Sequence, residues 1–145
     1  MERRDLLIGT GALVAAATAR TVLAQQEHAH HTHREQKYSA LVSTATDCVK
    51  TGAVCIDHCL DLFAQGDVST AECARSVSQM RPVCDTLAVL AAQNSKLLSG
   101  YAKVAAEYCK YCEDECRKHE KEHEVCKSCA EACAACGKEC QKAAV

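Results

Sequence analysis

The spacing of thirteen cysteines constrains the fold of this 145-residue chain more than any other feature. All of them lie between residues 48 and 140, and the intervals within a predicted helix are three, four, seven or eleven residues. Each of these intervals returns a side chain to the same face of an α-helix. One proline and six glycines are too few turn residues for a loop-rich disulfide fold. The pattern therefore predicts long helices that each carry a stripe of sulfur.

Breaks in the helical pattern define four segments, which we place at about residues 35–64, 69–92, 94–119 and 122–143. Ser69 and Glu72 are predicted to form a capping box, in which both side chains bind free amides at the start of the second helix. Pro82 removes one backbone hydrogen bond from that helix, so we expect a kink near Ser78. Asn94 is predicted to open the third helix.

Short connections force consecutive helices to run antiparallel, so the predicted fold is all-α: an up-down-up-down four-helix bundle with a cysteine-lined core. Charged residues occupy the positions between the cysteines, as at Glu113, Lys127 and Glu131, which places the sulfur stripe on the buried face. The candidate metal-binding thiols are Cys48, Cys55, Cys59, Cys73, Cys84, Cys109, Cys112, Cys116, Cys126, Cys129, Cys133, Cys136 and Cys140.

The two ends of the predicted bundle differ in composition. Cysteines crowd toward the end where the first and third helices terminate and the second and fourth begin. The opposite end gathers leucines and should be plugged by Leu41, Leu87, Leu90, Leu97 and Leu98.

The N-terminal residues are predicted to lie outside the bundle. Residues 1–24 combine Arg3 and Arg4 with a short apolar run and small residues near Ala24, which indicates an export signal resembling the twin-arginine type. Residues 25–34 are predicted to form a flexible tail with histidines at 28, 30, 31 and 33, which could bind Cu(II) or Zn(II) or serve only as a solubilising segment. The bundle then occupies 35–145, and the expected location is the periplasm, with no membrane association after cleavage.

Thirteen thiols in an oxidising compartment admit three uses: packing, disulfide bonds or metal binding. Cysteines four residues apart on a helix have Cβ atoms about 5–6 Å apart, farther than the roughly 3.8 Å that a disulfide needs. Two metal–sulfur bonds of about 2.3 Å can bridge such a pair by choice of rotamer. Cross-helix disulfides remain possible for some cysteines.

The row of thiols favours several soft ions over one reactive centre. Zinc requires closed four-coordinate sites, and iron–sulfur clusters use cysteines on loops that wrap the cluster. Cu(I) accepts two or three thiolates, and each sulfur can bridge two ions, so such a stripe could hold roughly as many ions as sulfurs. This indicates storage and not an enzyme. A formal net charge of -2 and a pI of about 6.4 lack the basic footprint of a nucleic-acid-binding protein.

The chain resembles the exported bacterial copper storage proteins. The resemblance is carried by the cysteine pattern as a whole, by residues 55–59 (CIDHC) and 109–116 (CKYCEDEC), and by the run from Cys126 to Cys140. It implies a four-helix bundle that assembles as a tetramer, stores many Cu(I) ions along its core, limits copper toxicity and holds copper for delivery to copper enzymes. It also implies that His58 is a ligand near the mouth. Methionines that help to form the mouth in some members are replaced here by Leu62, Gln65 and Thr70.

Copper is expected to enter at the thiol-rich end, assisted by His58 and by His119 or His123. Two other functions stay open from the sequence: a disulfide-stabilised helical interaction module, and a protein that binds several zinc ions through thiolates.

Overall fold

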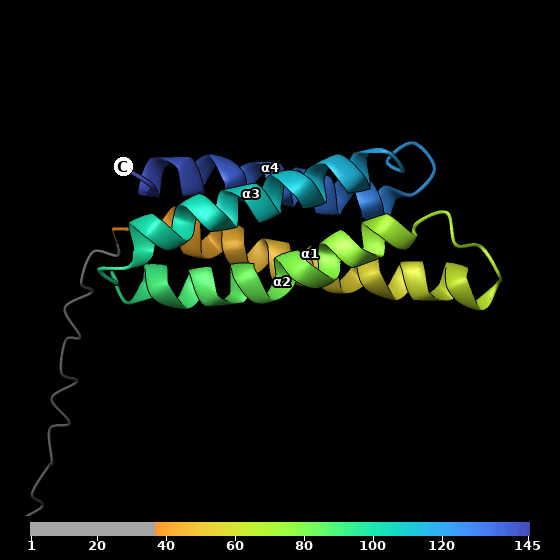
Figure 1. Cartoon of the computed structure of the whole chain (residues 1–145), viewed down its shortest axis with the longest axis horizontal. Coiled ribbons are helices and arrows are strands. Elements are labelled where there is room, and N and C mark those ends of the chain that lie inside the picture. The colour runs from red at the N-terminus through yellow and green to blue at the C-terminus, as the bar shows by residue number, and fades with distance from the viewer. Residues whose placement is uncertain (1–36) are drawn as a thin grey trace, which may run out of the picture. The chain divides into compact units, whose positions relative to one another are not determined.

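The computed structural model describes residues 37–145, and four helices make up this part of the chain without any strand (Figure 1). Their bounds are Ser39–Ala64 for α1, Ala71–Ala92 for α2, Leu98–Arg117 for α3 and Glu124–Ala143 for α4. The backbone of each helix lies close to two others: α1 and α3 both adjoin α2 and α4, whereas the backbones of the diagonal pairs, α1 with α3 and α2 with α4, stay farther apart. Consecutive helices run in opposite directions, which confirms the predicted up-down-up-down bundle.

The predicted export signal and the histidine tract at residues 28–33 lie outside the described residues. None of the helices in 37–145 is both long enough and apolar enough to cross a bilayer.

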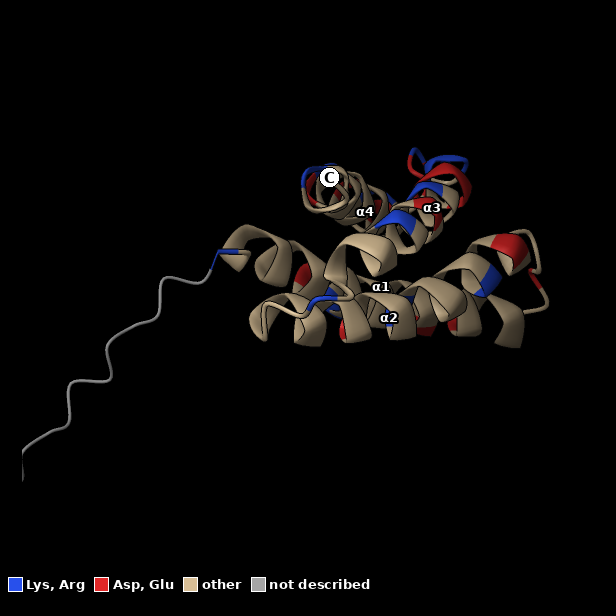
Figure 2. Ribbon diagram, turned by 60° about the vertical axis from the view of Figure 1, so that its left-hand side comes forward, with Lys and Arg blue, Asp and Glu red and all other residues tan. Residues whose placement is uncertain are grey.

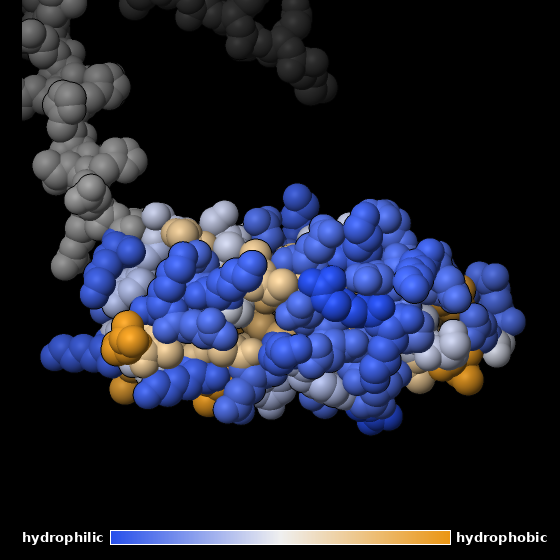
Figure 3. Space-filling model, turned by 90° about the horizontal axis from the view of Figure 1, so that it is seen from above, coloured by the Kyte–Doolittle hydropathy of each residue, from blue (hydrophilic) through white to orange (hydrophobic). Residues whose placement is uncertain are grey.

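The core of the bundle is built from small and medium side chains. Thirteen cysteines share it with aliphatic residues such as Ala45, Val77, Leu87 and Ala105, all fully buried. No charged residue of 37–145 is buried, and Figure 2 shows where these residues lie along the helices. Arg117, for example, pairs with Glu113 and Glu120 one turn away. Hydrophilic residues also cover most of the face seen in Figure 3. This separation of polar and sulfur-bearing faces is what turns the cysteine stripes inward.

The ends of α1 and α2 explain the lengths of the helices. Gly66 and Asn94 both have positive φ, 84° and 50°. At α2, the Asn94 amide bonds the Ala91 carbonyl and the next amide bonds the Leu90 carbonyl, which is the Schellman arrangement with asparagine in the left-handed position. The prediction that Asn94 opens the third helix was therefore wrong, because this residue closes the second helix and α3 begins only at Leu98.

The predicted capping box is also wrong. Thr70, and not Ser69, is the residue before α2, and no side chain caps that helix end. The Ser69 amide instead donates to the Asp67 carboxylate at 2.8 Å. Glu72 faces another helix, where it accepts a hydrogen bond from the Tyr111 hydroxyl at 2.5 Å. This bond to α3 takes the carboxylate that the box would have used.

Pro82 is tolerated because it lies on the exposed side of α2, which continues through it. The kink near Ser78 stays a prediction.

The leucine-rich end is closed, with one correction. Leu41, Leu87 and Leu98 are buried and Leu90 is partly buried. Leu97 is 74% exposed, because it precedes α3 and its side chain points out of the bundle. Three leucines from α1, α2 and α3 therefore form the plug.

α1 and α2 approach closely at Gly52. A Cβ atom there would lie 2.9 Å from Arg81 Cγ and 3.1 Å from Met80 Cε. We expect Gly52→Val to lower the free energy of unfolding of the reduced apoprotein by about 1–3 kcal/mol, because the added methyl groups overpack this contact. Urea unfolding followed by circular dichroism measures the change.

Gly100 provides the matched control, since a Cβ atom on it meets nothing within 4 Å. Gly100→Val should shift the free energy of unfolding by no more than about 0.5 kcal/mol. Equal stabilities of the two valine variants would show that the contact at Gly52 is not tight.

Candidate metal-binding core

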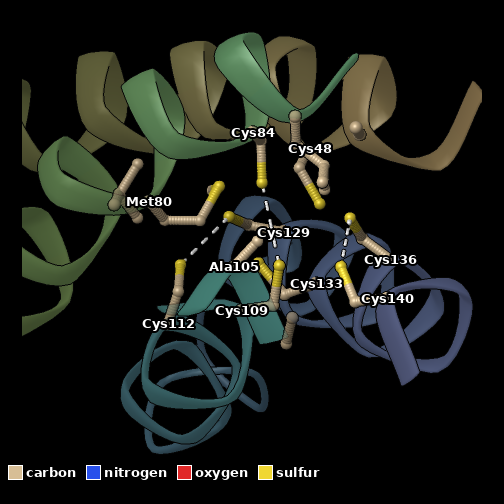
Figure 4. Close-up of a cluster of buried hydrophobic side chains, with 14 of the residues drawn as sticks. Cys48, Met80, Cys84, Ala105, Cys109, Cys112, Cys129, Cys133, Cys136 and Cys140 are labelled. Carbon is tan, nitrogen blue, oxygen red and sulfur yellow. Dashed lines mark hydrogen bonds between the residues drawn. The ribbon is translucent and has the colours of Figure 1, made fainter. Parts of the chain in front are cut away.

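All thirteen cysteines are fully buried, and all are free thiols. They come from every helix of the bundle, and the sulfur atoms of the cysteines labelled in Figure 4 point toward one another in its interior. α1 supplies Cys48, Cys55 and Cys59; α2 supplies Cys73 and Cys84; α3 supplies Cys109, Cys112 and Cys116; and α4 supplies Cys126, Cys129, Cys133, Cys136 and Cys140. The structure thus brings together every cysteine that the sequence singled out.

The sulfur–sulfur distances suit bridging by a metal ion. Within helices, Cys112 Sγ and Cys116 Sγ lie 3.9 Å apart and Cys136 Sγ and Cys140 Sγ lie 4.0 Å apart. Two bonds of about 2.3 Å to one ion span up to roughly 4.6 Å. Even the Cys73–Cys116 contact between helices, at 3.4 Å, is far longer than a disulfide bond of about 2.05 Å.

The thiols fall into overlapping groups whose sulfur atoms all lie within 4.8 Å of one another. Cys55 and Cys129 each belong to two groups, so neighbouring groups are connected. One group has four members, Cys48, Cys84, Cys109 and Cys136, and three groups have three: Cys55, Cys59 and Cys73; Cys55, Cys116 and Cys129; and Cys112, Cys129 and Cys133. Cys126 adjoins the triplets through its sulfur contact with Cys55, and Cys140 adjoins the quartet through its contact with Cys136.

Burial and mutual hydrogen bonding control the ionisation of these thiols. Burial raises the pKa of Cys59, and the hydrogen bond with Cys112 raises that of Cys116. In contrast, the pKa of Cys129 is lowered by S–H donation from Cys112 and that of Cys136 by donation from Cys109. Among the triplets the first negative charge is therefore best stabilised at Cys129, and in the quartet it is best stabilised at Cys136, while the neighbouring thiols stay protonated.

Histidines gather at the thiol-rich end. His58 Nε2 on α1 lies 3.1 Å from His123 Nδ1, just before α4, and the ring of His119 lies 6.4 Å from that of His123. All three are partly buried. The sequence predicted His58 as a ligand and named His119 and His123 as alternatives for assisting it. The structure pairs His58 with His123, a contact that depends on how the end of α1 packs against the start of α4.

Two residues of this region were not among the predicted ligands. Thr70 Oγ1 is buried without a hydrogen-bond partner among the described residues. Met80 is fully buried beside the cysteines (Figure 4). Its position in the stripe was visible in the sequence, but whether its thioether meets the thiols depends on the helix packing.

Comparison with known proteins shows which proteins share this architecture. The model of the family described as copper storage protein matches residues 34–145. No curated protein sequence matches the chain significantly.

Solved structures resemble it over most of their length. Apo copper storage protein 3 from Bacillus subtilis is 26% identical with a TM-score of 0.64, covering 73% of this chain and 97% of that one. Cu(I)-bound BsCsp3 is 27% identical with a TM-score of 0.67, covering 75% and 100%. A cytosolic copper storage protein from Streptomyces lividans with five coppers is 26% identical with a TM-score of 0.67, covering 74% and 91%.

The family model covers the whole described bundle, and the related structures share its four helices. This chain belongs to the copper storage protein family.

Proposed function

We propose that this protein stores many Cu(I) ions along its core and binds them through the thiolates of all thirteen cysteines. One observation carries the proposal: every cysteine is buried and free, and its sulfur lies close enough to that of at least one other cysteine for the two to bind one ion. Soft thiolates select Cu(I), and groups of three fit its low coordination number.

Charge balance supports copper as the stored ion. An isolated charge in this core would be strongly destabilised. Equal numbers of Cu(I) ions and thiolates form a neutral assembly, so a filled core does not carry a growing net charge. Two sulfurs, Cys55 and Cys129, are already shared between groups, as bridging ligands must be.

The physiological role that fits such a core is that of a reservoir and not an enzyme. It would hold copper for delivery to copper enzymes and limit copper toxicity. The predicted signal at residues 1–24 supports a periplasmic location, unlike the relative from Streptomyces lividans, which is described as cytosolic. Assembly as a homotetramer is proposed from the family resemblance.

Copper would enter at the end where the histidines lie. His58 and His123 contact each other there. His58 directly precedes Cys59, and His123 lies three residues before Cys126. The opposite end is sealed by leucines. A partly buried imidazole pair can pass Cu(I) from a solvated donor to the first thiols.

Copper capacity tests the proposal directly. Anaerobic titration of reduced apoprotein against a competing Cu(I) chelator should give about one ion per thiol of the thirteen cysteines. Cys129→Ser should cost more copper ions than Cys140→Ser, because Cys129 belongs to two thiol groups and Cys140 to none. A capacity of one or two ions with the remaining thiols oxidised would instead favour a disulfide-stabilised module.

The access route is tested by the rate of loading. His58→Ala should slow Cu(I) transfer from the chelator while leaving the capacity nearly unchanged, and His123→Ala should do the same because the two rings form one pair. Lys96→Ala, near the leucine-rich end, is the matched control. If His58→Ala loads as fast as this control, the histidine pair is not on the route.

The stability of the apoprotein and that of the copper-loaded form are expected to depend on pH in opposite directions. Nine thiols have raised pKa values and two have lowered ones. A thiol whose pKa is higher in the folded than in the unfolded state stabilises the fold below its unfolded pKa, about 8.5, and this stability is lost as the pH rises further. The reduced apoprotein should therefore unfold at lower urea concentrations above about pH 8.5.

The loaded form should lose stability on acidification, because protons compete with copper for the thiolates. Urea midpoints of both forms across the pH range measure the two trends. An apoprotein midpoint that stays constant or rises at alkaline pH would contradict the assigned thiol pKa values.

A further inference from the structure

We propose that the core contains a single tetrathiolate site for a divalent ion such as Zn(II), formed by Cys48, Cys84, Cys109 and Cys136. The site goes beyond copper storage, and it does not depend on that function. The divalent ion would occupy this site when copper is scarce, and Cu(I) would displace it when copper becomes available.

The geometry of this quartet matches tetrahedral coordination. Each helix contributes one thiol, and all four sulfurs lie within 4.8 Å of one another. Tetrahedral zinc with bonds of about 2.3 Å places its sulfur ligands roughly 3.8 Å apart. Cys84 Sγ and Cys109 Sγ already lie 3.7 Å apart (Figure 4). Small rotations of the remaining side chains would close the site without moving a helix.

The other thiol groups in residues 37–145 do not offer the same coordination. Each contains three thiols, and Cys55 and Cys129 are shared between groups. Zn(II) in a closed protein site takes four ligands, whereas Cu(I) is satisfied by two or three. The cysteine count alone would allow three zinc sites, but the packing of the helices assembles four thiols at only one place in the described bundle.

Charge explains why the divalent ion would be held less firmly than copper. Each thiol loses its proton when it binds, so Zn(II) with four thiolates releases four protons and leaves a buried net charge of about -2. Cys140, whose Sγ lies 4.0 Å from Cys136 Sγ, can donate its S–H to that thiolate and partly offset the charge. Cu(I) ions replacing zinc would neutralise the same thiolates completely, and no oxidant or reductant is needed for this exchange.

Cobalt(II) is the probe for the site, because its visible ligand-field absorption reports tetrahedral thiolate coordination and its chemistry parallels that of zinc. Anaerobic titration of the reduced full chain should develop this absorption up to one equivalent. Zn(II) and then Cu(I) should each abolish it. No tetrathiolate absorption, or a signal that grows well beyond one equivalent, would overturn the proposal.

Two substitutions on α4 test which of its cysteines belongs to the site. Cys136→Ser should abolish the tetrathiolate absorption and weaken Zn(II) binding at least roughly 100-fold, since loss of outer-shell partners alone costs about 10–100-fold. Cys126→Ser, on the same helix but outside the quartet, should retain the absorption. Equal effects of the two substitutions would place the ion elsewhere and refute the assignment.

Cadmium-113 NMR of the unmodified protein covers the case in which a serine variant does not fold. One equivalent of Cd(II) should give one resonance in the range of four sulfur ligands, and a shift indicating three or fewer would refute the site. Copper capacity measured on the same preparation separates the two proposals. Full copper loading without a tetrathiolate signal would overturn the zinc site and leave copper storage standing.

Discussion

The complete burial of thirteen free thiols around one axis is the constraint on which the rest of this structure depends. Cysteine is small and packs as a weak hydrophobe, so the bundle closes around it with few large side chains. The same burial keeps most of the thiols protonated, because a thiolate is poorly solvated there. The apoprotein is thus a folded, nearly neutral core in which soft ions can replace protons one by one.

The number of thiols that meet at each point decides which ion they suit. Groups of three, linked through Cys55 and Cys129, match the low coordination number of Cu(I) and allow bridging. The one quartet, drawn from all four helices, matches tetrahedral divalent ions as well. Cu(I) with an equal number of thiolates is neutral, while zinc with four is not. Coordination number and charge therefore both favour copper for filling the whole core.

The two ends of the bundle also differ in chemistry. His58 and His123 meet where α1 ends and α4 begins, and leucines close the other end. The sequence predicted this asymmetry from helix direction, but it misjudged details that depend on loops. Leu97 is exposed, Asn94 closes α2, and Glu72 binds Tyr111 and not the helix end. In each case a local pattern was outweighed by the way the chain turned or by a partner on another helix.

The sequence by itself determined that the protein is helical and that its cysteines share the buried face, because spacings of three, four, seven and eleven are properties of one helix. It could also indicate metal over disulfide for the pairs within a helix. Which thiols from different helices form a triplet or a quartet, and which two histidines touch, was decided only by the tertiary structure. Those contacts depend on the axial offset and rotation of one helix against another, which side-chain packing sets and periodicity does not encode.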